Sequence, residues 1–230
     1  MRTLGMDRED TRRLAAEVFG TFALVFAGTG AIVINDISDH AITHVGIAMT
    51  FGWIVLAMIY AIGDISGCHL NPAVTLGFLG AGRMEKRLVI PYILSQLAGA
   101  ILASIVLKIL FPEHKTLGAT LPHGSEWQSF ILEVVLTMIL MVVILCVSSG
   151  SKEKGILAGV AIGSVIALEA MFAGPISGAS MNPARSLAPA LLSWHLPSLW
   201  IYLAAPVIGA LFAIPIFRTL YISEQRGVGS

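Results

Sequence analysis

Two short stretches of the chain are nearly alike, ISGCHLNPAV at residues 65–74 and ISGASMNPAR at residues 176–185. Each contains an Asn-Pro-Ala triplet. Asn is a preferred N-cap of helices, and Pro is tolerated in the first helical turn because its missing N–H would be unpaired there. The triplets therefore predict two helix starts, at Asn71-Pro72-Ala73 and at Asn182-Pro183-Ala184.

The two Asn-Pro-Ala triplets can provide hydrogen-bond donors from the Asn side chains and positive partial charge from the helix N-termini. Each Asn oxygen can accept from free N–H groups of its own helix, which leaves the side-chain NH₂ as an outward donor. Each helix N-terminus also carries about +0.5 of an elementary charge. If the two ends face each other, a passing water must point its oxygen at the amides, and cations meet a positive barrier. We expect such a site to pass neutral polar molecules and to exclude protons and other cations.

The residues before each cap are expected to supply acceptors. Non-helical backbone is tolerated at membrane depth only where it lines a cavity or is buried in protein. We therefore expect two short ladders of backbone carbonyls along a narrow pore, from Gly67, Cys68 and His69 and from Gly178, Ala179 and Ser180.

Two acidic residues occupy corresponding places in apolar segments, Glu17 in LAAEVFGT and Glu133 in FILEVVLT. A carboxylate inside a membrane is costly, so a functional role is the default interpretation. The pair can brace the N–H groups of the two loops, or it can carry protons. We favour bracing because the two residues are paired across the repeat.

The composition is that of an integral membrane protein. The 230 residues are 56% hydrophobic and 12% charged, whereas soluble domains carry roughly 25% charged residues. The net charge of zero gives no electrostatic support for a nucleic-acid partner. The two cysteines, Cys68 and Cys146, are too few for a disulfide framework or a zinc site. We expect no metal and no cofactor.

Six stretches are apolar and long enough to cross a bilayer core, which takes about 20 helical residues. They are residues 14–34, 44–62, 88–110, 130–148, 156–172 and 199–221. Two further apolar pieces, residues 71–80 and 182–192, are half as long. The sequence predicts an all-α membrane protein with one domain over residues 1–230. Because each half holds three spans and one half-helix, the repeats at about 14–111 and 130–221 must be inverted, as in many membrane transport proteins.

The distribution of Lys and Arg along the chain predicts how the protein is oriented in the membrane. Eleven basic residues would fall on one side of the membrane, namely Arg2, Arg8, Arg12, Arg13, Arg83, Lys86, Arg87, Lys152, Lys154, Arg218 and Arg226. Three would fall on the other side, namely Lys108, Lys115 and Arg185. The positive-inside rule then places both termini in the cytoplasm. The short termini, without an obvious targeting signal, favour a bacterial cytoplasmic membrane.

Six spans, two Asn-Pro-Ala half-helices and Arg185 after the second triplet resemble the aquaporin superfamily of major intrinsic proteins. The resemblance covers residues 14–220, and GPISGASMNPARSLAPAL at 174–191 is similar to the nodulin-26-like branch and its bacterial relatives. It implies a passive channel, not an enzyme. It also implies membrane lipid around the protein and a homotetramer with one pore in each subunit.

The resemblance implies a constriction, the selectivity filter of the family, formed by Phe51, Ala170, Ala179 and Arg185. Water-selective members typically have His where this chain has Ala170. Glycerol facilitators tend to have two aromatic residues and an Asp after the Arg, but here Ser186 follows. Because Ala170 is smaller than the His of water-selective members, the resemblance implies a wider ring. We therefore expect passage of water and of small uncharged solutes: glycerol, urea, ammonia, or undissociated arsenous, boric or silicic acid.

Two alternatives remain open at this stage. One is a strictly water-selective channel, and the other is an ion-coupled secondary transporter, which would need a protonatable centre at the midplane. Glu169 is expected in a helix or loop contact, and Asp64 in a solvated loop. The histidines outside the motif are expected to be solvated, namely His40, His44, His114, His123 and His195.

Overall fold

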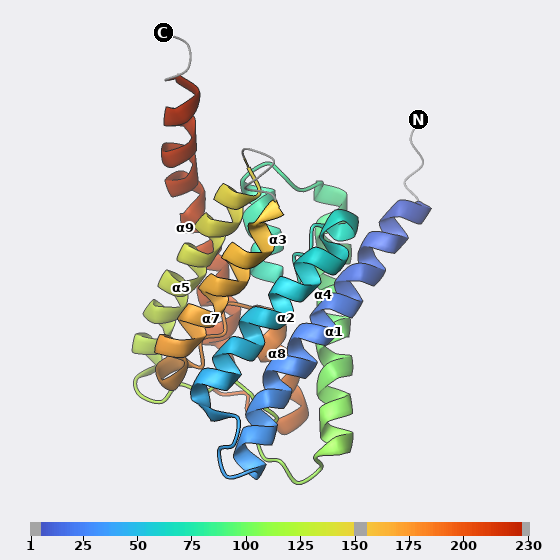
Figure 1. Cartoon of the computed structure of the whole chain (residues 1–230), viewed down its shortest axis with the longest axis vertical. Coiled ribbons are helices and arrows are strands. Elements are labelled where there is room, and N and C mark those ends of the chain that lie inside the picture. The colour runs from blue at the N-terminus through green and yellow to red at the C-terminus, as the bar shows by residue number, and fades with distance from the viewer. Residues whose placement is uncertain (1–5, 150–155, 227–230) are drawn as a thin grey trace.

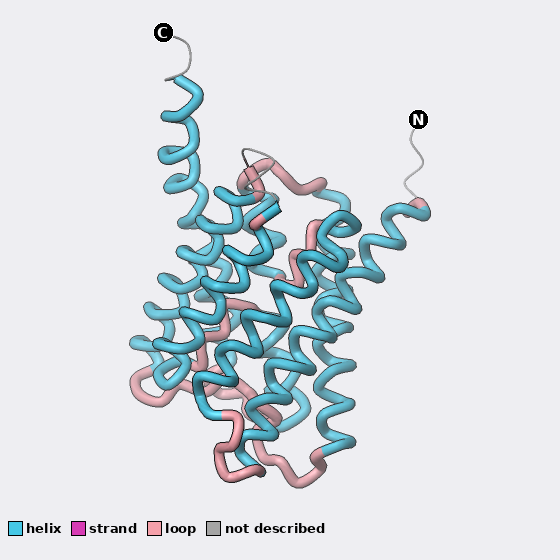
Figure 2. The backbone as a smooth tube through the Cα atoms, in the orientation of Figure 1, coloured by secondary structure: helices cyan, strands magenta, loops and turns pink. Residues whose placement is uncertain are grey.

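The computed structural model describes residues 6–149 and 156–226, and this part of the chain forms eight helices. In chain order they are α1 (Arg8–Ile37), α2 (Thr43–Ser66), α3 (Pro72–Gly80), α4 (Lys86–Leu110), α5 (Glu126–Val147), α7 (Ala158–Ser177), α8 (Pro183–Ser193) and α9 (Leu199–Arg226). Six of them are long and apolar enough to cross a membrane. The predicted all-α fold with six spans and two half-helices is confirmed, and the described chain contains only helices and connecting loops (Figure 2).

The six long helices pack as three close pairs: α1 with α4, α5 with α9, and α2 with α7. Glycines allow the close approach. A Cβ on Gly52 of α2 would collide with the carbonyl oxygen of Gly163 of α7, and a Cβ on Gly163 would collide with the carbonyl of Gly52. Gly99 of α4 lies in the same way against the backbone of α1, and Gly209 of α9 against that of α5. Small residues at such crossings provide the close packing that drives helix association in lipid.

The half-helices lie inside this frame and approach its middle from opposite ends (Figure 1). α2 and α7 both end at a glycine in the left-handed conformation, Gly67 (φ 82°) and Gly178 (φ 85°), which stops each helix and turns the chain inward. α3 and α8 then begin at Asn71 and Asn182, with a proline in the first turn. Each half-helix packs mainly against α4 and α9.

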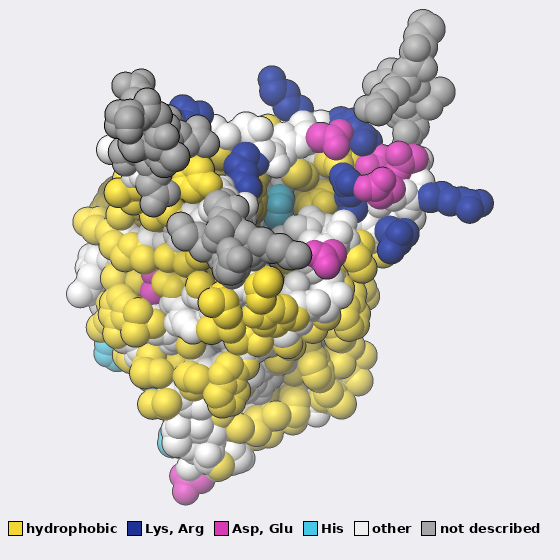
Figure 3. All heavy atoms as spheres, turned by 45° about the horizontal axis from the view of Figure 1, so that its top comes forward, with side chains coloured by type: hydrophobic (Ala, Val, Ile, Leu, Met, Phe, Trp, Pro, Cys, Tyr) yellow, Lys and Arg dark blue, Asp and Glu magenta, His cyan; other side chains and the backbone are white. Residues whose placement is uncertain are grey.

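The outer surface divides into an apolar flank and a charged end (Figure 3). Large apolar side chains on the flank are exposed, among them Phe19 on α1, Trp53 on α2 and Leu168 on α7. The start of α1 and the end of α9 lie at the same end of the bundle (Figure 1), where charged side chains gather (Figure 3). Of the basic residues in the orientation argument, Arg2, Lys152 and Lys154 lie outside the described residues.

The α2–α7 crossing yields a first prediction. We expect Gly52→Ala to lower the thermal stability of the protein in detergent, because the new methyl group would lie 2.6 Å from the Cβ of Ala167 and closer still to the backbone of Gly163. Overpacking of this kind costs about 1–3 kcal/mol. Gly63→Ala on the same helix is the matched control, since its Cβ would meet only Ile59 at 3.8 Å. Equal melting temperatures for the two variants would contradict this account of the crossing.

Candidate functional site

The two cap asparagines are bonded to each other's loops. The Nδ2 of Asn71 donates to the carbonyl oxygen of Met181 at 2.7 Å, and the Nδ2 of Asn182 donates to the carbonyl oxygen of Leu70 at 2.8 Å. Since an amide NH₂ has two N–H donors, one N–H of each asparagine remains for other partners. The cross-bonds join the starts of α3 and α8.

Each asparagine also caps its own half-helix. The Oδ1 of Asn71 accepts from the N–H of Ala73 at 2.8 Å. The Oδ1 of Asn182 accepts from the N–H groups of Ala184 at 3.0 Å and Arg185 at 3.3 Å. Because these bonds fix the oxygen toward the helix, the nitrogen must point away from it. The side-chain donors thus face the other half of the molecule and the space beside it.

The loops before the caps have an unusual backbone that is the same in both halves. In the first loop, Cys68 and Leu70 both have a φ of 51°. In the second loop, the corresponding residues Ala179 and Met181 have φ values of 42° and 53°. The left-handed region costs a residue with a side chain about 1–2 kcal/mol. Other contacts must therefore hold these two loops in place.

Glu17 supplies those contacts to the first loop. Its carboxylate, fully buried, accepts from the N–H of His69 at 2.9 Å, from the N–H of Leu70 at 2.8 Å and from the hydroxyl of Ser66 at 2.7 Å. The Nε2 of Gln96 on α4 donates to the same carboxylate at 2.8 Å. Four donors thus converge on one buried acceptor group.

Glu133 does the same in the second loop. Its carboxylate accepts from the N–H of Ser180 and the N–H of Met181, both at 2.8 Å, and from the hydroxyl of Ser177 at 2.7 Å. The hydroxyl of Tyr202 on α9 donates to the carbonyl of Ser177 at 2.6 Å, just as the hydroxyl of Tyr92 donates to the carbonyl of Ser66 at 2.9 Å in the first half. The carboxylates therefore contact the loop backbones as bracing requires, and their acceptor positions are occupied by local donors.

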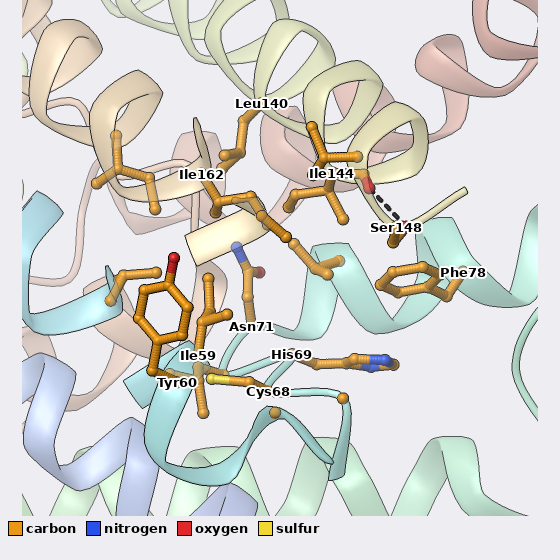
Figure 4. A pocket seen from close by; sticks show the side chains of 18 of the residues that line it. Ile59, Tyr60, Cys68, His69, Asn71, Phe78, Leu140, Ile144, Ser148 and Ile162 are labelled. Carbon is orange, nitrogen blue, oxygen red and sulfur yellow. Dashed lines mark hydrogen bonds between the residues drawn. The ribbon is translucent and has the colours of Figure 1, made fainter. Parts of the chain in front are cut away.

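A cavity of about 870 Å³ leads from the charged end of the bundle to the cap asparagines. Apolar side chains of five helices, α1, α2, α3, α5 and α7, form most of its wall, and the first loop contributes the residues from Gly67 to Asn71. Figure 4 shows Asn71 among these side chains, with Ile59 and Tyr60 on one side and Ile144 and Ile162 on another. The cavity is thus an apolar tube with a polar strip along one loop.

A much smaller cavity of about 40 Å³ continues on the far side of the asparagines. The two cavities share six lining residues, namely Leu24, Val55, Asn71, Leu140, Ile166 and Asn182. The small cavity is also lined by all four residues of the expected constriction, Phe51, Ala170, Ala179 and Arg185. The structure thus brings together residues from α2, α7, the second loop and α8 around the narrowest space.

Arg185 is held firmly in this constriction. Its guanidinium lies 4.9 Å from the centre of the Phe51 ring, and one terminal nitrogen donates to the carbonyl oxygen of Gly118 at 2.8 Å. Its Nε has no hydrogen-bond partner within residues 6–149 and 156–226. The side chain is buried, so a fixed positive charge stands at the narrowest point.

Several contributors were not foreseen from the sequence. Leu70 and Met181 supply the carbonyls that receive the cross-bonds, and Gly118 comes from the loop between α4 and α5. Only the position of Leu70 and Met181 next to the caps could have indicated them. Gly178, which was expected in the second ladder, does not line the small cavity. The prolines and alanines of the triplets are buried and line neither cavity, namely Pro72, Ala73, Pro183 and Ala184.

Two of the single-residue expectations need correction. His114 was expected to be solvated, but only 7% of its side chain is exposed, because it bonds to Asp36 and to the backbone of its own loop. Glu169, expected in a helix or loop contact, is buried inside the bundle, and its carboxyl has no hydrogen-bond partner in the described part of the chain. Asp64 was expected in a solvated loop, but it lies in the last turn of α2, where it is exposed and lines the wide cavity.

This geometry defines a class of protein. A membrane-spanning bundle with two adjoining cavities, two opposed half-helices at its middle and a buried arginine beside the smaller cavity is a membrane channel of the aquaporin type. The family model of the major intrinsic proteins matches residues 6–217. The chain therefore belongs to the major intrinsic protein family, that is, to the aquaporin superfamily.

Sequence relatives place the chain within the family. It is 48% identical over 200 residues to aquaporin NIP1-1 of Zea mays, covering 86% of this chain and 71% of that one. It is 43% identical over 215 residues to nodulin-26 of Glycine max, covering 93% and 79%. The expected similarity to the nodulin-26-like branch is confirmed.

A solved structure gives the same fold. The aquaglyceroporin from Plasmodium falciparum superposes with a TM-score of 0.83, covering 96% of this chain and all of that one. The sequences are 23% identical, so the likeness concerns the arrangement of the helices alone.

The bracing carboxylates yield a second prediction. We expect Glu133→Gln to lower the melting temperature and the yield of folded protein, because an amide cannot accept from both loop N–H groups. Leaving one buried N–H unpaired costs about 1–3 kcal/mol.

Glu169→Gln is the matched control, since that side chain is equally buried and has no bonded partner in the described chain. Thermal melts followed by size-exclusion chromatography in detergent measure both variants. A Glu133→Gln protein as stable as Glu169→Gln would show that the carboxylate is not needed to hold the loop.

Proposed function

We propose that this protein is a passive channel for water and small uncharged solutes that excludes protons and ions. One observation carries the proposal: the wide cavity and the narrow one are lined in common by both cap asparagines, so one passage runs by them. The family to which the chain belongs supports it. A passage of this kind needs neither a cofactor nor a reacting group.

We propose that the Asn-Pro-Ala motifs are the barrier to cations. The cross-bonds hold two helix N-termini against each other, and each carries about half a positive charge. The amide donors that remain orient the oxygen of a passing water, so its neighbours turn in opposite directions. The backbone carbonyls of Gly67, Cys68 and His69 on one side, and of Ala179 and Ser180 on the other, are proposed as the acceptors along the path.

We propose that Phe51, Ala170, Ala179 and Arg185 form the selectivity filter. Two of the four side chains are single methyl groups, so the ring is wide on the sides that Ala170 and Ala179 occupy. Arg185 presents planar donors to hydroxyl or carbonyl oxygens and repels cations. This combination suits glycerol, urea, ammonia and undissociated arsenous, boric or silicic acid.

A third prediction tests the width of the filter. We expect Ala170→His to reduce the flux of glycerol or urea by about tenfold or more, a barrier increase of roughly 1.4 kcal/mol, while water still passes. The imidazole would fill space that the methyl group of Ala170 leaves open. Stopped-flow light scattering on proteoliposomes measures water and solute permeability in the same preparation.

Ala170→Ser is the matched control, because it adds a polar group with little bulk and should keep solute flux. Wild-type vesicles that conduct water but none of the larger solutes would contradict the wide filter and favour the strictly water-selective alternative.

An ion-coupled secondary transporter is the alternative function from a different class of membrane protein. It would need a protonatable or cation-binding centre at the midplane, where this chain instead has two amides and two carboxylates filled by local donors. A fourth prediction follows: solute flux through the wild-type protein does not change when a proton gradient is imposed across the vesicle membrane. Uphill solute accumulation driven by that gradient would establish the transporter.

We further propose an assembly and an orientation. The family resemblance implies a homotetramer with one pore in each subunit, and the exposed apolar flank offers surface for neighbouring copies and lipid. Native mass spectrometry counts the copies.

The positive-inside rule favours both termini in the cytoplasm. The chain is an integral membrane protein, but the relatives named above are plant proteins and give no support for a bacterial cytoplasmic membrane.

A further inference from the structure

The guanidinium of Arg185 depends on one loop for its position. Its hydrogen bond to the carbonyl of Gly118 is the single side-chain hydrogen bond that it makes to the described residues. The loop between α4 and α5, together with the ring of Phe51, therefore positions the guanidinium in the constriction. What holds Gly118 then also determines the shape of the filter.

Gly118 lies in a left-handed turn. Both Leu117 (φ 52°) and Gly118 (φ 73°) have positive φ values, a conformation that is unfavourable for a leucine. Leu117 is completely buried, and Gly118 packs so closely on Thr29 of α1 that a Cβ would lie 2.8 Å from the Cβ of Thr29. The N–H of Leu117 donates to the Nδ1 of His114 at 3.0 Å. This bond ties the residue before Gly118 to the histidine.

The imidazole of His114 is held by both of its nitrogens. Because Nδ1 accepts from Leu117, the ring proton must be on Nε2, and that nitrogen lies 3.2 Å from an oxygen of Asp36 at the end of α1. The ring is thus a neutral bridge from α1 to the turn, in one tautomer. A chain of three hydrogen bonds leads from Asp36 through His114 and the turn to Arg185.

The charged groups around His114 come from three elements. Asp36 belongs to α1, and Glu113 and Lys115 flank the histidine in its loop. Lys108 of α4 donates from its Nζ to the carbonyl of Pro112 at 2.6 Å. Asp36, Glu113, His114 and Lys115 line one solvent-facing cavity of about 500 Å³, so protons from the bulk can reach the ring.

We propose that His114 is a positioning residue for Arg185 and makes the filter sensitive to pH. A protonated His114 would carry a hydrogen on Nδ1, which would then oppose the N–H of Leu117 instead of accepting from it. The turn would shift, the carbonyl of Gly118 would release the guanidinium, and the filter would discriminate less between water and larger solutes. The inference rests on the proposed function, since it concerns the same constriction.

The test compares permeability ratios in proteoliposomes. The measured quantity is the ratio of solute permeability to water permeability, for the largest solute that the wild-type protein passes. We expect His114→Phe to raise this ratio about threefold, because the variant loses the hydrogen bonds that His114 makes. In wild-type protein, the ratio rises toward that value as the medium is acidified and Nδ1 of His114 takes up a proton.

His114→Asn separates positioning from protonation, because its side-chain oxygen can still accept from Leu117 but does not titrate. The solute-to-water permeability ratio of His114→Asn stays at the value that the wild-type protein has before acidification, and it does not vary with pH. His123→Phe, at an exposed histidine of the same loop, is the matched control and behaves as wild type.

Two results would overturn the proposal: equal ratios for wild type and His114→Phe at about pH 7.5, or the same pH profile for wild type and His114→Asn. If His114→Phe does not fold, the comparison of the two pH profiles decides alone. Absence of water flux in the wild-type protein would instead count against the proposed function, so the two failures are distinguishable.

Discussion

Irregular backbone at the middle of a membrane protein is the constraint on which this structure depends. No water is present in the hydrocarbon core to satisfy loop N–H groups, so the protein must satisfy them itself. Glu17 and Glu133 do so by accepting from two consecutive N–H groups each. The same bonds hold the left-handed residues before the caps, which would otherwise relax. Without them, neither half-helix would have a defined starting point.

The electrostatic properties of the site depend on the bracing of the two loops by Glu17 and Glu133. Once the loops are fixed, Asn71 and Asn182 can donate across the pseudo-symmetric centre, and the two positive helix ends are locked together. An opposed pair of helix N-termini repels cations from both directions, whereas an isolated one attracts anions. Under the function we propose, the backbone supplies much of the selectivity against ions, and the side chains adjust the width.

The two halves differ where function requires a difference. Gln96 donates to Glu17 and to Thr75 in the first half, whereas in the second half a chain of hydroxyls links Thr120, Ser186 and Ser180. Arg185 stands only in the second half, where the loop between α4 and α5 closes over it. One mouth of the passage is consequently wide, and the other narrows to a charged constriction.

The sequence by itself determined the class of fold, the six spans, the two half-helices and the paired roles of Asn and Glu. These features depend on local patterns: hydropathy over twenty residues, an N-cap followed by proline, and a motif written twice. The four expected residues of the constriction followed from resemblance, and their meeting in space is a matter of the tertiary structure. Only the fold decided that each asparagine gives one donor to the other loop, that Gly118 holds Arg185, and that His114 is buried. Such contacts join residues 67 to 112 positions apart, and no periodicity or composition encodes which loop will reach which side chain.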